Sequence, residues 1–371
     1  MNSNSYFSKV PLIGYLWLLC CGLYITKITS FSPVYPVFVL SLLCMFLSFL
    51  QCSDFIVTKK SLILILIIAL SFCLFLNSEL SLVINIVITL FSPIFTSFFF
   101  KDKWISSNKL LMVFFIYGLL FCLDGFWRLS HPYTVNIDKL ESLGIGFQIY
   151  KVNSFMYLDS NFVGLQAILF LSAFLYFFRN VRLYKFSWFL YTIILGLLIL
   201  GTALTFSRAA VISMVMLFIL YFLMGKRNSL IIFLFIAPVL FSFAGFYTYE
   251  KFNSDISFSS KFHIISATIN YISNASLSNI LFGLGVGNAV DAIGMGAHNI
   301  LITYLLETGL LGMFLFLSIL LYLCCSLKDD MLIVVFPFLI TAMSLGTTAI
   351  PYFLTFACLA VLYKKQRFCI I

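Results

Sequence analysis

Long apolar runs recur from one end of this chain to the other, and they limit what it can fold into. Of its 371 residues, 63% are hydrophobic and only 9% are charged, whereas soluble domains carry about 25% charged residues. The runs are roughly 17 to 25 residues long, the length that a helix needs to cross about 30 Å of hydrocarbon. The sequence therefore predicts an all-α protein that crosses a membrane many times.

We expect a polytopic bundle of about twelve transmembrane helices in a single domain, residues 1–371. The predicted spans are at approximately 10–28, 34–51, 61–77, 80–100, 109–127, 160–178, 187–205, 208–224, 230–248, 299–325, 331–347 and 349–363. Most connections are short, but those at about 128–159 and about 249–298 are longer. Binding and catalytic residues are commonly found on long loops held by a rigid scaffold.

Lysine and arginine are unevenly distributed over the predicted connections. If the N-terminus is cytoplasmic, most of them lie on the cytoplasmic side, and the remainder are Lys27, Arg128, Lys139, Lys151, Arg208, Lys251 and Lys261. Cytoplasmic loops of membrane proteins carry an excess of basic residues. We therefore expect both termini in the cytoplasm and both longer loops on the outer face. The net charge of +9 reflects this asymmetry and does not indicate binding to nucleic acid.

The second long loop, about 249–298, contains a helical pattern. Phe262, Ile265, Ile269 and Ile272 recur at helical spacing, with polar residues between them. This pattern predicts an amphipathic helix that lies in the membrane interface. Such a helix could simply cover the bundle or could contact a substrate, and the pattern fits both.

His298 and Asn299 follow several glycines, from Gly283 to Gly296, at the start of a predicted span. Glycines let a backbone approach a ligand closely, and a helix N-terminus offers unpaired N–H groups that suit phosphate. An imidazole titrates near pH 6.5, so His298 could act as a general base for a hydroxyl group. The alternative is a structural polar residue at a helix start.

Arg208 and Glu307 are ionisable residues in or beside predicted spans. A guanidinium group near hydrocarbon costs about 2.5 to 3.5 kcal/mol and cannot be deprotonated. Arg208, with Ser207 beside it, should therefore have an anionic partner, either in a built site or as a lipid phosphate. Glu307 likewise needs a partner or a wet cavity.

Two further polar patterns have local explanations. Asp159, Ser160 and Asn161 precede a predicted span and predict an N-cap, because their side chains accept hydrogen bonds from first-turn N–H groups. Asp124 and Arg128 are spaced for an ion pair on one helix face.

The predicted outer loops contain no DxD pair, no HExxH and no Ser/His/Asp signature. We therefore expect no metal and no cofactor, and no protease mechanism. A phosphorylated substrate would have to be neutralised by basic side chains. Arg208 and Lys261 are the best-placed candidates.

Three blocks resemble the O-antigen ligase and polysaccharide polymerase superfamily of bacterial inner membranes. They are DSNFVG at 159–164, LTFSRAAV at 204–211, and a glycine-rich segment continuing into AHNILITYLLETGLLG at 283–312. The last is the most specific. The resemblance covers about residues 155–315. Where that family commonly has arginine at the start of the amphipathic loop helix, this chain has Lys261, which cannot make a bidentate phosphate contact.

The resemblance implies a GT-C-like, metal-independent, inverting glycosyltransferase with its active site on the periplasmic face. Its donor would be a glycan on undecaprenyl diphosphate. Arg208, helped by Lys261, would bind the diphosphate, while His298 would orient or deprotonate the acceptor hydroxyl and Asn299 would position it. Further substrate-binding positions implied by the resemblance are Ser207, Asp159, Asn161 and Glu307.

Three functions are compatible with these patterns. We favour a polymerase that joins lipid-linked repeat units, with a flippase and a chain-length regulator acting in the same pathway. An O-antigen ligase would use the same donor but transfer the glycan to lipid A core. A polysaccharide flippase or transporter is the alternative from another class, because about twelve spans and several prolines within them are common in transporters.

Overall fold

The part of the chain that the structure describes is mostly helical. The computed structural model describes residues 10–25, 32–51, 78, 80–101, 105–133, 149–157, 159–179, 185–224 and 256–368. Every regular element in these ranges is a helix, which confirms the all-α prediction. Within these ranges, four helices are long and apolar enough to cross a membrane: Leu80–Phe100, Ser107–Ser130, Ser160–Phe178 and Ile300–Val334. The predicted spans at 61–77 and 230–248 lie outside the described residues, as do residues 134–148 and 249–255 of the two long loops.

In the described part of the chain, helices occupy the other predicted spans except 331–347, although the first helix ends at Cys20, inside the predicted span 10–28. They are α2 (Val10–Cys20), α3 (Val34–Gln51), α5 (Leu80–Phe100), α6 (Ser107–Ser130), α8 (Ser160–Phe178), α9 (Lys185–Ala203), α10 (Arg208–Leu223), α15 (Ile300–Leu327) and α18 (Pro351–Phe368). A short 3₁₀ helix, η2 (Lys328–Asp330), follows α15.

The predicted span at 331–347 does not form one continuous helix. Two short helices, α16 (Met331–Val334) and α17 (Phe336–Ala342), occupy its first part, and residues 343–350 are not helical. Pro337 has no N–H to donate to the carbonyl of Ile333. That carbonyl accepts a hydrogen bond from the Ser172 hydroxyl of α8 instead.

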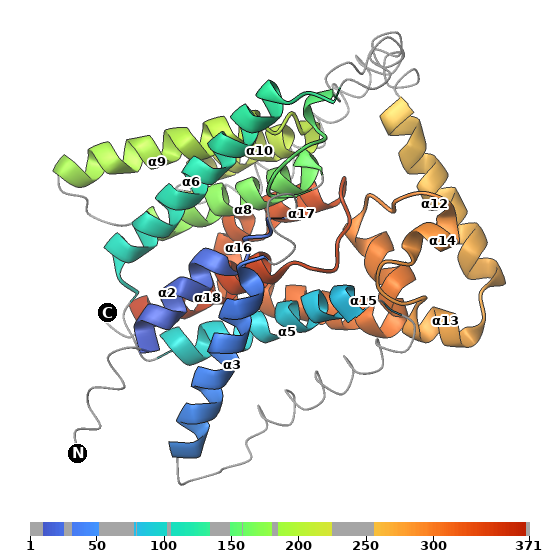
Figure 1. Cartoon of the computed structure of the whole chain (residues 1–371), viewed down its shortest axis with the longest axis horizontal. Helices are drawn as coiled ribbons and strands as arrows, with labels where there is room; N and C mark the ends of the chain where they lie inside the picture. The colour runs from blue at the N-terminus through green and yellow to red at the C-terminus, as the bar shows by residue number, and fades with distance from the viewer. Residues whose placement is uncertain are drawn as a thin grey trace.

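Helix α8 forms the centre of the bundle (Figure 1) and is buried along nearly its whole length. It packs against α6, α9, α10, α16, α17 and α18. Phe170 of α8 contacts the rings of Tyr117 and Phe356, with centroid distances of 3.8 and 4.7 Å. In contrast, α15 exposes large apolar side chains such as Phe314 and Leu321. An apolar interior together with an apolar surface is expected for a protein embedded in lipid.

Small residues bring α6 and α9 close together. A Cβ added to Gly125 of α6 would lie 2.6 Å from Leu204 Cβ, and one added to Gly201 of α9 would lie 2.6 Å from Phe121 Cβ. Helices in membranes commonly pack through small residues of this kind. The packing places the turn after α9 directly against the last turns of α6.

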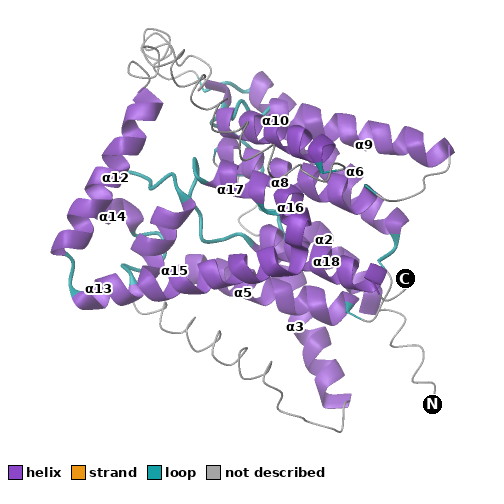
Figure 2. Cartoon of the chain, turned by 180° about the vertical axis from the view of Figure 1, so that it is seen from behind, coloured by secondary structure: helices purple, strands orange, loops and turns teal. Residues whose placement is uncertain are grey.

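Three helices form a separate group at one end of the molecule: α12 (Ile256–Asn274), α13 (Leu277–Phe282) and α14 (Ala289–Ile293). The start of α2 and the end of α18 lie at the opposite end (Figure 1), and the view from behind agrees (Figure 2). Ile264 of α12 packs with α14 and with Leu306 of α15. The predicted apolar stripe, including Phe262 and Ile269, is exposed instead. This stripe therefore does not cover the bundle.

Candidate functional site

The N-terminus of α8 carries Asp159 and Asn161. Asp159 is the N-cap, as predicted, because its Oδ1 accepts a hydrogen bond from the Asn161 N–H at 2.8 Å. The Asn161 side-chain amide donates to Asp159 Oδ2 at 3.2 Å. Ser160 donates through Oγ to the carbonyl oxygen of Thr205 at 2.7 Å. These contacts fasten the start of α8 to the turn that precedes α10.

Arg208 is the first residue of α10, and its side chain is exposed. The preceding residue, Ser207, is buried, and its hydroxyl accepts a hydrogen bond from the Ala210 N–H at the start of the helix. Phe206 has a φ of 53°, a left-handed conformation that costs about 1 to 3 kcal/mol for such a side chain. This strained turn therefore determines the direction in which the exposed Arg208 side chain points.

Lys151 lies beside Arg208 and Asp159, and sequence reasoning did not select it. Its carbonyl oxygen accepts a hydrogen bond from the Ser160 N–H at 3.0 Å. Burial lowers the pKa of Lys151, the Asp159 carboxylate opposes that change, and the Arg208 guanidinium lowers the pKa further. Lys151 is thus close enough to both other charged groups to be influenced by them, and we call Lys151, Asp159 and Arg208 the Lys151 group.

His298 and Asn299 begin α15 at the same end of the molecule as α12 (Figure 1). The Asn299 side-chain oxygen caps the helix, accepting hydrogen bonds from the N–H groups of Leu301 and Ile302 at 2.9 and 3.3 Å. His298 has a φ of 42°. Within the described ranges its imidazole is exposed and forms no hydrogen bond, so the ring can accept one from a ligand.

The segment 343–348, which follows α17, connects several of the predicted residues. Lys261 of α12 donates through Nζ to Ser344 Oγ at 3.0 Å, and the Asn299 amide lies 3.8 Å from Met343 Sδ. We call Lys261, His298 and Asn299 the His298 group. Sequence reasoning missed the contacting segment because its composition resembles the end of a transmembrane span.

The glycine-rich segment has a structural role that differs from the expected one. Helix α15 is broken at Gly309, where φ is 65°. The N–H groups of Leu284 and Gly285 donate to the carbonyl oxygens of Leu306 and Glu307 at 2.8 and 3.1 Å. A Cβ added to Gly283 would lie 2.4 Å from the Glu307 carbonyl oxygen. Gly283 and Gly285 therefore bring the backbone close to the broken helix.

Replacing Gly309 by alanine should destabilise the protein strongly. The new Cβ would lie 2.4 Å from the carbonyl oxygen of Leu281, and the positive φ alone costs about 1 to 3 kcal/mol. We expect a large fall in the thermal unfolding midpoint of the detergent-solubilised protein. Gly294 has a positive φ but open space around it, so Gly294→Ala should lower the unfolding midpoint less. Gly196 also has open space but no positive φ, so Gly196→Ala should not lower the midpoint. Equal midpoints for the three variants would contradict the interlocked loop.

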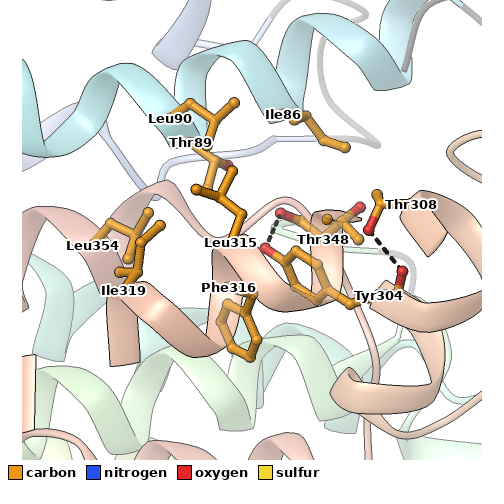
Figure 3. Close-up of a pocket in the computed structure, with 11 residues that line it drawn as sticks. Ile86, Thr89, Leu90, Tyr304, Thr308, Leu315, Phe316, Ile319, Thr348 and Leu354 are labelled. Carbon is orange, nitrogen blue, oxygen red and sulfur yellow. Dashed lines mark hydrogen bonds between the residues drawn. The ribbon is translucent and has the colours of Figure 1, made fainter. Parts of the chain in front are cut away.

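Glu307 has the partner that its burial requires. The Thr348 hydroxyl donates to Glu307 Oε2 at 3.1 Å. A neighbouring pocket between α5 and α15 is lined by apolar side chains such as Ile86 and Leu315, with Thr348 at one end (Figure 3). Glu307 is not part of its lining, so the pocket suits hydrocarbon and not a charged ligand.

Apart from Glu307, the predicted residues thus lie in or beside one of these two groups, and α17, together with the segment that follows it, contacts elements of both. It packs on α10, where Thr341 Oγ1 donates to Ser213 Oγ at 2.8 Å, and the segment after it contacts Lys261 and Asn299. No hydrogen bond or ion pair joins His298 to the Lys151 group in the described part of the chain. Among those residues, no cluster of His, Cys, Asp and Glu could hold a metal ion.

Comparisons with known proteins do not add a relative to this picture. No protein-family model matches the sequence, and no curated protein is significantly similar to it.

Proposed function

We propose that this membrane protein is a polysaccharide polymerase that transfers a glycan from a polyprenyl diphosphate. The observation that carries the proposal is the Lys151 group, in which two cations lie beside the N-termini of α8 and α10. Helix N-termini and basic side chains both favour phosphate. The three sequence blocks resemble a superfamily whose glycan donors are carried on undecaprenyl diphosphate, and this resemblance supports the same assignment.

In the proposed reaction, the acceptor hydroxyl attacks the anomeric carbon of the lipid-linked sugar. The new C–O bond forms as the bond to the diphosphate breaks, and the electron pair moves to the phosphate oxygen. Arg208 and Lys151 stabilise that developing charge, while His298 accepts the hydroxyl proton. An inverting displacement needs the base and the leaving group on opposite faces of the sugar, which suits two separate groups of residues. The resemblance implies that Lys261 helps Arg208 bind the diphosphate, but Lys261 contacts the same segment as Asn299, so we propose that both bind the acceptor.

We also propose the complete membrane arrangement: about twelve spans, GT-C-like, in a bacterial inner membrane with both termini cytoplasmic. The position of α12–α14 opposite the start of α2 and the end of α18 (Figure 1) supports an active site on the periplasmic face.

The lowered pKa of Lys151 predicts a pH dependence for donor binding. Only the charged ammonium attracts a diphosphate, so affinity is full below the pKa of Lys151 and falls as pH rises through it. Because burial lowers this pKa from its ordinary value of 10.5, the loss should begin at a lower pH than for an exposed lysine. This pH dependence is measured by titrating geranylgeranyl diphosphate into the purified protein at several pH values. Lys151→Arg should move the loss to higher pH, and an unchanged profile would contradict the role of Lys151.

Polymerase and ligase activities differ only in the acceptor, and a genetic experiment separates them. Deleting the gene in its host should leave lipid A core that carries one repeat unit, as seen on a lipopolysaccharide gel. Complementation with the wild-type gene should restore long chains, whereas His298→Ala should not. If the deletion removes all O-antigen from the core, the protein is a ligase.

A transporter remains the second candidate because of one observation. Helix α15 is broken beside the buried carboxylate of Glu307, and transporters commonly place binding sites at such breaks. If Glu307 carried a coupled proton, Glu307→Gln should abolish activity in cells. The resemblance implies substrate binding by Glu307, but its carboxylate is buried and accepts a hydrogen bond from Thr348. We therefore propose a structural role, and Glu307→Gln should keep most polymerase activity because Gln can still accept that hydrogen bond.

A further inference from the structure

Asp124 and Arg128 form an ion pair that is completely buried. Arg128 Nε lies 2.8 Å from Asp124 Oδ2, and neither side chain is exposed. The spacing on α6 predicted this pair. Burying two charges has a large desolvation cost, and apolar residues of similar size often stabilise a fold equally well. Stability alone therefore does not explain why these two residues are charged.

Arg128 uses its other nitrogens on two different segments. Nη1 donates to the carbonyl oxygen of Tyr150 at 2.8 Å, and Nη2 donates to that of Leu204 at 3.0 Å. Tyr150 directly precedes Lys151. Leu204 begins the strained turn that ends before Arg208. One guanidinium group thus bridges the two segments that carry the cations of the Lys151 group.

Asp124 also binds the segment that contains Tyr150, at a second point. Its Oδ1 accepts hydrogen bonds from Ser154 Oγ at 2.6 Å and from the Phe155 N–H at 3.0 Å. Ser154 Oγ in turn accepts from the N–H groups of Met156 and Tyr157. Residues 150–157 are therefore fastened to α6 at both ends of a short loop.

We propose that the Asp124–Arg128 pair is a positioning pair, which fixes the distance between Lys151 and Arg208 so that both can contact one diphosphate. The identity of this ligand rests on the proposed function. Neither residue is accessible to a substrate, so both act through the segments that they hold. Removing the charge of Asp124 should loosen residues 150–157 and let Lys151 move away from Arg208.

Binding of geranylgeranyl diphosphate to Asp124→Asn, Arg128→Lys and Ser154→Ala in detergent tests this proposal. We expect Kd to rise about 10- to 100-fold for the first two, as is typical when supporting hydrogen bonds are lost, and less for Ser154→Ala. In a double-mutant cycle, the effects of Asp124→Asn and Lys151→Met on the free energy of diphosphate binding should be less than additive. Phe174→Leu, a core variant of α8, controls for stability: at an equally lowered unfolding midpoint it should keep the wild-type Kd.

A measurement without ligand separates this proposal from the proposed function. The pH profile of Lys151 labelling by an amine reagent, followed by mass spectrometry, should shift towards that of an ordinary lysine in folded Asp124→Asn. A folded variant with an unchanged labelling profile would overturn the positioning role. If wild-type protein binds no prenyl diphosphate but the labelling profile shifts, the proposed function fails and the positioning role stands.

Discussion

Replacing His298 by alanine should lower the rate of glycan transfer about 10² to 10⁴-fold, the usual contribution of a general base. The imidazole is exposed at the start of α15, so its loss should affect the reaction much more than the fold. The rate is measured with purified protein and a polyprenyl-diphosphate-linked repeat unit, by separating the products according to length.

Two variants control this experiment. His298→Asn tolerates the left-handed backbone at this position and can orient a hydroxyl group, but it cannot take a proton at neutral pH. If His298 acts as a base, His298→Asn should be as inactive as His298→Ala. If His298 only orients the hydroxyl group, His298→Asn should show an intermediate rate. His131→Ala, whose ring stacks on Trp127 at 3.9 Å, should retain normal activity. Normal transfer by both His298 variants would remove this residue from the mechanism.

Replacing Arg208 by alanine should lower the transfer rate about 10² to 10³-fold, because a donor to the developing charge is lost. Arg208→Lys should recover only part of the activity, since an ammonium group cannot make the two parallel hydrogen bonds of a guanidinium. Both variants should also weaken binding of a prenyl diphosphate.

Arg179 provides the matched control for Arg208. It is the C-cap of α8 and donates to the carbonyl oxygen of Met224, the C-cap of α10, at 3.1 Å, so Arg179→Lys changes an arginine that contacts the end of α10 opposite to Arg208. We expect normal transfer by this variant. Equal losses for Arg179→Lys and Arg208→Lys would indicate a general effect on the fold.

Periodicity and caps in the sequence predict many of the helices. The ends of α5 and α8 agree with their predicted spans because an apolar run is bounded by polar residues or by a cap such as Asp159. The break at Gly309 lies inside one predicted span. It is accompanied by hydrogen bonds that the N–H groups of Leu284 and Gly285 donate to the carbonyl oxygens of Leu306 and Glu307, and the donors belong to a separate loop. A local pattern does not contain that contact.

The candidate site could likewise be predicted only in part, because some of its contacts join distant segments. Arg208 and His298 are visible in the sequence as polar groups in an apolar chain. Lys151 is one of several outer lysines, and only its pairing with the start of α8 places it beside Arg208. Gly283 carries a motif-like signal, but the close contact that requires it is with α15. Contacts between distant segments decide each of these roles.

The most direct measurement of the proposed function is chain lengthening by the purified protein in lipid nanodiscs. The reaction contains an undecaprenyl-diphosphate-linked repeat unit and a chelator, with no ATP and no ion gradient. We expect a ladder of longer lipid-linked glycans from wild-type protein and none from His298→Ala or Arg208→Ala. If the wild-type protein lengthens no lipid-linked glycan, and instead moves the repeat unit across sealed vesicles under an ion gradient, the protein is a transporter and the polymerase proposal is wrong.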